Sequence, residues 1–154
     1  MEHQYQLQTN WKGNTGQGTS SYTQYERSFE TIIPNKQTIL GSSDEAFRGD
    51  NKKHNPEELL LAALSSCHML WFLHICATEK IVIEAYTDKA VGTMVTDNTG
   101  AGRFTNAVLN ITIKVAGNID IDKINGLHTQ ANKLCFIAQS VNFSVEHTCS
   151  VELA

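Results

Sequence analysis

The chain of 154 residues lacks several features that mark particular classes of protein. It has no internal repeat, no low-complexity tract and no proline-rich linker, which excludes a repeat array. It has no basic excess, because the net charge is −4, so a nucleic-acid partner has no electrostatic support. Its polar start, MEHQYQLQTNWKG, lacks the apolar segment of a secretory signal. We therefore expect a cytoplasmic protein.

The four cysteines lack any Cys-x-x-Cys pair, which argues against a zinc ribbon and a thioredoxin-like motif. Stable disulfides are rare in the cytoplasm, so we interpret the cysteines as free thiols, metal ligands or redox groups. The hydrophobic content of 41% and the charged content of 18% are typical of a globular chain rather than a disordered one. The length predicts one domain over residues 1–154.

One stretch is apolar enough to be tested as a membrane span. Leu59 to Ala77 contains no Asp, Glu, Lys or Arg and is long enough to cross a bilayer. It also contains two serines and two histidines, and it is the only such stretch. We therefore expect no membrane partner, and a helix buried on nearly all sides of a soluble protein.

The N-terminal third predicts short strands followed by a helix. Tyr5, Leu7, Thr9 and Trp11 alternate on one face, which indicates a strand. The segment SYTQYERSFETII predicts a second strand, and residues 38–40 a short third. In NPEELLLAALSSCHML the first residue is a good N-cap, the proline suits the first helical turn, and a glutamate stands three after the cap. This helix is expected to end near residue 78.

The rest of the chain predicts a hairpin, a helix and a strand. The segments IVIEAYTDKAVGTMVT and RFTNAVLNITIKV form the hairpin across the turn DNTGAG. Apolar residues spaced by three and four between 121 and 138 predict an amphipathic helix, capped near Asp120. The end, NFSVEHTCSVELA, alternates again. This order predicts an α+β protein with a mainly antiparallel sheet.

The cysteines differ in their surroundings. Cys149 and Cys76 lie among apolar residues and are interpreted as small core side chains. Cys67 follows Ser65 and Ser66 and precedes His68, a polar break in an apolar helix, so a reactive thiol and a core thiol stay equally open. Cys135 borders the apolar stripe of the second helix. The sequence leaves open whether these two thiols meet.

The acidic residues at the start of the helix have a structural explanation, because glutamates favour the positive end of a helix. A role at Cys67 must satisfy geometry: Glu57 precedes Cys67 by ten residues, which is about 15 Å along the axis. Glu57 therefore cannot touch Cys67 of its own helix. If both serve one site, Glu57 must come from a second chain.

At these residues the chain resembles the osmotically inducible protein C / organic hydroperoxide resistance (OsmC/Ohr) family. The helix signature Asn-Pro-Glu-Glu followed ten residues later by Cys67, a second cysteine on a later helix, and the order of elements carry the resemblance. It implies an OsmC-like fold, in which sheets wrap around two central helices in an intertwined homodimer. It also implies a thiol peroxidase that reduces organic hydroperoxides, including those of fatty acids.

Site roles follow from the same resemblance. Cys67 would be the peroxidatic cysteine, Cys135 the resolving cysteine, and Glu57 the residue that orients an arginine beside the Cys67 thiolate. A dithiol such as a lipoylated protein would reopen the disulfide, and neither a cofactor nor a metal is implied. The chain departs from the family in having Phe136 where proline commonly follows the second cysteine. No motif fixes the arginine: Arg48 is favoured and Arg27 is close behind.

Two other functions remain open. The first is the same dimer with inert thiols and a pocket for a small hydrophobic ligand, lined by Trp71, Phe72, Phe136 and Phe143. The second is a thiol-based redox sensor, for which we find no DNA-binding or partner module. A single low-pKa thiol at Cys67 would favour catalysis over ligand binding.

Overall fold

The computed structural model describes residues 1–117 and 119–153. The chain divides into two compact units, Met1–Leu60 and Leu61–Ala154, and the helix α1 (Pro56–Thr78) begins in the first and continues in the second. The prediction of one domain over residues 1–154 stays a prediction.

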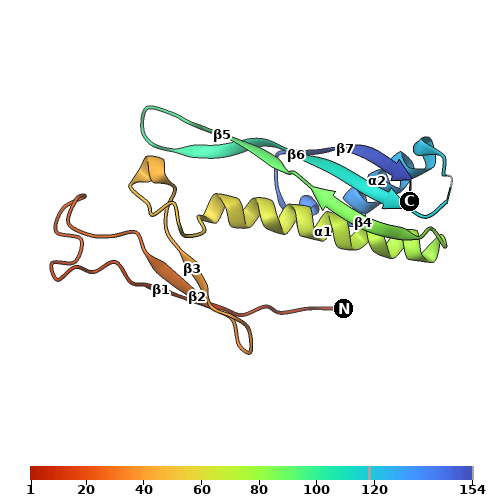
Figure 1. Cartoon of the computed structure of the whole chain (residues 1–154). Helices are drawn as coiled ribbons and strands as arrows, with labels where there is room; N and C mark the ends of the chain where they lie inside the picture. The colour runs from red at the N-terminus through yellow and green to blue at the C-terminus, as the bar shows by residue number, and fades with distance from the viewer. Residues whose placement is uncertain (118, 154) are drawn as a thin grey trace. The chain divides into compact units, whose positions relative to one another are not determined.

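The first unit contains a three-stranded antiparallel sheet, β1 (Gln8–Trp11), β2 (Phe29–Ile32) and β3 (Ile39–Gly41), in that order (Figure 1). A short 3-10 helix, η1 (Glu45–Phe47), follows. Phe29 pairs with Gly41, and a Cβ atom on Gly41 would lie 2.1 Å from the Phe29 ring, so a larger residue there would force the ring to move. Strands β1 and β2 both begin later than the sequence predicts. Residues 1–7 precede β1, and residues 21–24, before β2, form turns and bends.

The start of α1 is the capping box that the sequence predicts. The Glu58 N–H donates to Asn55 Oδ1 over 2.7 Å, and the Asn55 N–H donates to Glu58 Oε2 over 3.2 Å. Both bonds satisfy N–H groups that have no partner inside the helix. The predicted end near residue 78 is confirmed.

Replacing Asn55 with alanine should lower the free energy of unfolding by about 1 kcal/mol, the usual effect of losing an N-cap side chain. Urea unfolding monitored by circular dichroism would measure it. Asn55→Ser is the control, because serine keeps an accepting oxygen without adding a charge beside Asp44, whose Oδ2 lies 3.4 Å from Asn55 Nδ2, and it should stay within about 0.5 kcal/mol of the parent. An equal loss in both variants would contradict the capping explanation.

The second unit is a four-stranded sheet built around the long strand β6 (Gly102–Val115). The single predicted strand before it is two strands, β4 (Ile83–Asp88) and β5 (Val91–Thr96), which pair antiparallel with opposite ends of β6. Strand β7 (Ser144–Leu153) pairs parallel with β6. The parallel pair arises because helix α2 (Ile121–Leu134) returns the chain to the starting end of β6.

The core of this unit lies between one face of the sheet and the two helices. The alternating side chains of β6 are all buried, as predicted: Ala107, Leu109, Ile111, Ile113 and Val115. From α2 the stripe is confirmed at Ile124, Leu127 and Ala131, while Ile121 and Leu134 at its ends are exposed. The predicted cap is also confirmed, since the Asp120 side chain accepts a bond from the Asp122 N–H.

Helix α1 is long and apolar enough to cross a membrane by length and composition. In the structure its buried side chains are Leu64, His68, Phe72, Ile75 and Cys76. Phe72, Ile75 and Cys76 pack with the sheet and α2 in one core cluster. Only 28% of its most apolar window is buried within this chain, so the expectation of a helix buried on nearly all sides is wrong for the single chain: one face packs into the core and side chains such as Leu70 are exposed.

Candidate active site

The second unit brings the thiols of Cys67 and Cys135 together. Cys67 lies on α1 and is half-buried, whereas Cys135 is the C-cap residue of α2 and has 0% of its surface exposed. Burial, and then a hydrogen bond with the Cys67 thiol, raise the pKa of Cys135 to about 11. The Ala138 N–H also donates to Cys135 Sγ over 3.4 Å. The two thiols therefore lie close enough to interact, which the sequence left open.

The polar break around Cys67 is satisfied by partners. Ser65 Oγ donates to Asp88 Oδ2 over 2.5 Å, and Ser66 Oγ donates to the Ala62 carbonyl over 2.7 Å. His68 is hydrogen-bonded to His128 rather than to the thiol. The two serines therefore cost the helix little, whereas the buried His68 keeps one ring nitrogen, Nδ1, without a partner among the described residues. Because consecutive residues of a helix point in different directions, Cys67 faces a different surface from His68.

That surface is a hollow of about 510 Å³ beside Cys67. Its lining residues come from α1 and from the turn after α2, and they are mostly apolar: Ala63, Ser66, Cys67, Leu70, Trp71, His74, Phe136 and Ile137. The edge of Trp71 packs on Phe136, with ring centroids 5.6 Å apart. The hollow offers apolar contact to the organic part of a ligand whose reactive end reaches Cys67.

Two of the four aromatic residues expected to line such a pocket do so. Trp71 and Phe136 line it, and Phe136 is 68% exposed. Phe72 is fully buried in the core. Phe143 packs against Phe104, with ring centroids 5.4 Å apart, and is not a lining residue. Neither residue lines this hollow: Phe72 faces the core from α1, the alternative that the sequence also allowed, and Phe143 stands in the bend just before β7.

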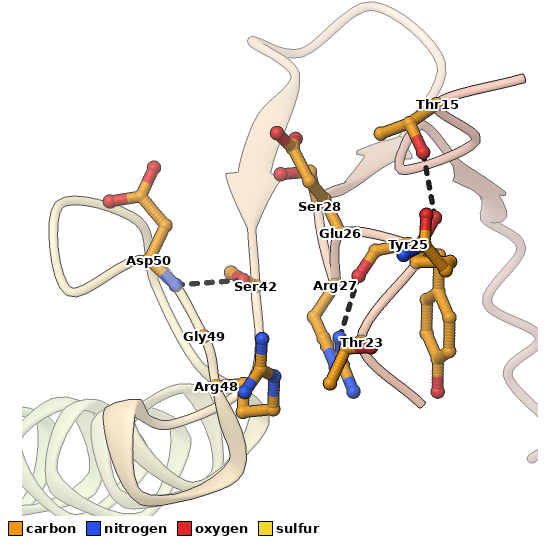
Figure 2. Close-up of a pocket in the computed structure, with 11 residues that line it drawn as sticks. Thr15, Thr23, Tyr25, Glu26, Arg27, Ser28, Ser42, Arg48, Gly49 and Asp50 are labelled. Carbon is orange, nitrogen blue, oxygen red and sulfur yellow. Dashed lines mark hydrogen bonds between the residues drawn. The ribbon is translucent and has the colours of Figure 1, made fainter. Parts of the chain in front are cut away.

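The first unit holds both candidate arginines around one polar pocket of about 500 Å³ (Figure 2). Arg27 is held tightly: its guanidinium donates to the carbonyls of Tyr25 and Tyr22 over 2.6 and 2.7 Å. It also lies over both tyrosine rings, 4.1 and 4.4 Å from their centroids. Arg27 therefore fastens the loop before β2.

Arg48 is held more loosely. It is exposed, it caps η1 in the left-handed conformation with φ 64°, and its guanidinium carbon lies 5.8 Å from the centroid of Tyr22. Among the described residues neither arginine forms an ion pair with a carboxylate. Figure 2 shows the two side chains at the same pocket. Of the two, only Arg48 has its hydrogen-bond donors free of local carbonyls.

Glu57 stands in the first turn of α1 and is half-buried. In the described part of the chain its Oε2 atom is buried without a hydrogen-bond partner. A buried carboxylate oxygen without a partner is costly, which marks it as an acceptor for a donor from elsewhere. The helix between Glu57 and Cys67 is continuous, so the separation of about 15 Å along the axis holds.

The structure adds a feature that the sequence pattern missed, a cluster of three histidines. His68, His128 and His147 come from α1, α2 and β7, with ring centroids 5.3 to 5.7 Å apart. Burial, and then nearby histidines, lower the pKa of His68 to about 4 and that of His128 to about 3. The only sequence signal for this cluster was the position of His147, which alternates with apolar residues in β7. Within residues 1–117 and 119–153 no group of three or more His, Cys, Asp or Glu side chains is placed to hold a metal ion.

The remaining thiols belong to the core, as the sequence predicts. Cys76 and Cys149 are packed in or against the hydrophobic cluster of the second unit. Burial raises the pKa of each thiol to about 11. Both are thereby kept protonated and poorly nucleophilic near neutral pH.

Comparison with known proteins agrees with this fold. An OsmC-like protein of unknown function from Vibrio cholerae has a TM-score of 0.87 and 29% identity, over 97% of this chain and 100% of that one. An organic hydroperoxide resistance protein from Elizabethkingia anophelis has a TM-score of 0.70 and 17% identity, with all of both chains covered. The second likeness shows the fold alone, which confirms the predicted α+β, OsmC-like architecture of the chain.

An uncharacterized protein of Methanocaldococcus jannaschii is 27% identical over 101 residues, which are 66% of this chain and 51% of that relative. The chain thus spans about half the length of this curated relative. The family model described as OsmC-like protein matches residues 49–150, which include α1, Cys67, Cys135, β6, α2 and most of β7. This match covers well over half of the sequence, and the chain therefore belongs to the OsmC-like protein family.

Proposed function

We propose that this protein is a cysteine-based thiol peroxidase that reduces organic hydroperoxides to alcohols. The observation that carries the proposal is the contact between the Cys67 and Cys135 thiols beside the apolar hollow. The half-buried Cys67 lines the hollow, and the buried Cys135 does not. Support also comes from the shared fold of the hydroperoxide resistance protein from Elizabethkingia anophelis.

The reaction proceeds in two steps on sulfur. The Cys67 thiolate attacks the outer oxygen of the hydroperoxide, so that an S–O bond forms, the O–O bond breaks and the alkoxide leaves as the alcohol after taking a proton. Sulfur loses two electrons and the peroxide gains them. The Cys135 thiol, protonated at rest because its pKa is raised to about 11, then attacks the sulfur of the adjacent Cys67 sulfenic acid: an S–S bond forms, the S–O bond breaks, and the leaving hydroxide takes the thiol proton and departs as water.

Activation of Cys67 needs a positive charge that its own helix does not provide, because α1 has no lysine or arginine and burial lowers the pKa of the adjacent His68 to about 4. We assign this role to Arg48 of a second copy of the chain, oriented by the unpaired carboxylate oxygen of Glu57 from that copy. Arg27 is the second candidate, but its donors are committed to two carbonyls. The working form is accordingly a homodimer.

Regeneration requires a reductant from outside the chain. A dithiol, such as the lipoyl group of a lipoylated protein, would open the Cys67–Cys135 disulfide by two thiol–disulfide exchanges and end as its own disulfide. No cofactor is needed, because sulfur carries both electrons. The reducing cytoplasm is the compartment in which such a cycle can be restored.

The proposal is tested by peptide-mapping mass spectrometry after one equivalent of an organic hydroperoxide, without added reductant. A Cys67–Cys135 disulfide should form within seconds, and Cys67→Ser should abolish it. A Cys67 that stays reduced, or that reacts no faster than Cys76 and Cys149, would refute the peroxidase function.

A second function is favoured by the apolar lining of the hollow. In that case the same dimer binds a small hydrophobic ligand between Trp71 and Phe136, and the thiols are inert. Native mass spectrometry of the purified dimer would then detect the bound ligand, whereas the peroxidase predicts an empty hollow and a hydroperoxide-dependent disulfide.

A further inference from the structure

We propose that the buried pair of His68 and His128 positions Cys67 against Cys135 for disulfide formation. The two histidines tie together the helices that carry the two thiols, through one hydrogen bond between His68 Nε2 and His128 Nδ1. The proposal rests on the Cys67–Cys135 couple of the proposed function. It concerns the second step, in which the S–S bond forms and water leaves.

The connection between the pair and the thiols is short on both helices. His68 directly follows Cys67 on α1, and His128 precedes Cys135 on α2 by seven residues, which is close to two full turns. His128 and Cys135 therefore lie on the same side of α2. Ala131 stands between them, fully buried and small, so the helix can approach its neighbours closely here.

The contact between the histidines is directional. The two nitrogens are 3.0 Å apart, and the face of His128 stacks on Phe72 of α1, with ring centroids 3.8 Å apart and planes within 1°. Sliding α2 along α1 would lengthen the hydrogen bond and break the stack together. Plain apolar packing tolerates such sliding better, because it has no preferred direction.

Burying the His68–His128 pair in the core is energetically costly. His68 and His128 are 1% and 0% exposed. Among the described residues, His68 Nδ1 and His128 Nε2 are buried without hydrogen-bond partners. Two leucines would fill the same space without unpaired polar atoms, so packing alone does not account for the histidines. A disulfide does need the precision, because its Cα atoms must lie about 4.4–6.8 Å apart.

The test is the effective concentration of the two thiols, measured by equilibrating the full-length protein with glutathione redox buffers and quantifying the Cys67–Cys135 disulfide. His68→Leu, His128→Leu and the double leucine variant should each lower it by about tenfold or more, since small misplacements of reacting groups carry penalties of this order. The double variant leaves no unpaired imidazole nitrogen, so it is the variant most certain to fold.

Conservative variants separate positioning from stability. Gln at 68 offers an amide near the position of Nε2 and Asn at 128 near that of Nδ1, so His68→Gln and His128→Asn should stay within about threefold of the parent. Val115→Ala, a buried change at the end of β6 and on neither helix, should lower the melting temperature without changing the effective concentration. Leucine variants within about twofold of the parent, despite a lower melting temperature, would overturn the proposal.

The same measurement is independent of peroxide chemistry. A parent protein that forms the disulfide from glutathione but ignores hydroperoxide would refute the peroxidase and leave the positioning role supported. A parent that turns over hydroperoxide while its leucine variants keep the effective concentration would refute only the positioning role.

Discussion

The Cys135→Ser variant is expected to reduce one equivalent of organic hydroperoxide and then to stop with Cys67 as a sulfenic acid. The first step needs only Cys67, while the second needs the thiol of Cys135 that lies in contact with it. Without a resolving thiol, further hydroperoxide should carry Cys67 to the sulfinic acid, which is not readily reversed. Trapping with dimedone and intact-mass measurement would follow both products.

The Cys67→Ser variant should lose turnover by at least about a thousandfold, since loss of a nucleophile has effects of this size or larger in other enzymes. Cys76→Ser and Cys149→Ser are the matched controls, because their thiols are kept protonated by burial and touch neither step. They should retain turnover with a lower melting temperature. Equal loss of turnover in Cys67→Ser and in both control variants would contradict the assigned roles and point to general destabilisation.

The sequence predicted best where one local signal decides the outcome. The capping residues placed the start of α1 correctly, and strict alternation identified every buried residue of β6. It failed where side-chain bonds or tertiary contacts override the local preference. The aromatic segment before β2 has strand-forming composition, yet residues 21–24 form turns and bends, and the Arg27 guanidinium bonds the carbonyls of Tyr22 and Tyr25. The parallel pairing of β7 was likewise invisible, because strand direction depends on where α2 returns the chain.

The candidate site was predictable in its members but not in its contacts. Spacing along one helix showed that Glu57 and Cys67 are far apart, and this holds in the structure. Whether Cys67 meets Cys135 depends on how α1 and α2 cross, which no periodicity reports. The histidine cluster was missed for the same reason: its three members come from three elements, and each alone has the pattern of an ordinary core residue.

The histidine pair also predicts that the protein loses stability in mild acid, between about pH 6.5 and pH 4. In the unfolded chain both imidazoles would have their ordinary pKa of about 6.5. In the folded protein burial lowers the pKa of His68 to about 4 and that of His128 to about 3. The unfolded chain therefore binds more protons over this range, and the free energy of unfolding falls as the pH falls.

The size of the effect follows from the two shifts. Each pKa unit corresponds to about 1.4 kcal/mol, so lowering the pH from 7 to 4 should cost roughly 3 kcal/mol for each histidine. The hydrogen bond between them couples the two protonations, which makes the sum of about 6 kcal/mol an upper bound. Against a total stability of about 5–15 kcal/mol for a small domain, a loss of this size is a large and measurable fraction.

Other titrating groups act outside this window or more weakly. His147, whose pKa is also lowered by burial, acts in the same direction. The lowered pKa values of Asp50 and Asp97 remove stability only once the pH falls below the usual aspartate range. The raised pKa of buried Asp88 acts in the opposite sense, because its protonation favours the folded state. The range from pH 6.5 to 4.5 therefore reports chiefly on the buried histidines.

Urea unfolding at half-unit intervals from pH 7.5 to 4.5 would measure this dependence. The double His68→Leu/His128→Leu variant should show a much flatter profile over the same range, because it has lost both groups whose proton uptake accompanies unfolding. A parent profile as flat as that of the double variant would mean that the folded protein accepts protons at these imidazoles. That result would be incompatible with a dry pair joined by one N–H···N bond, and so also with the positioning role assigned to it.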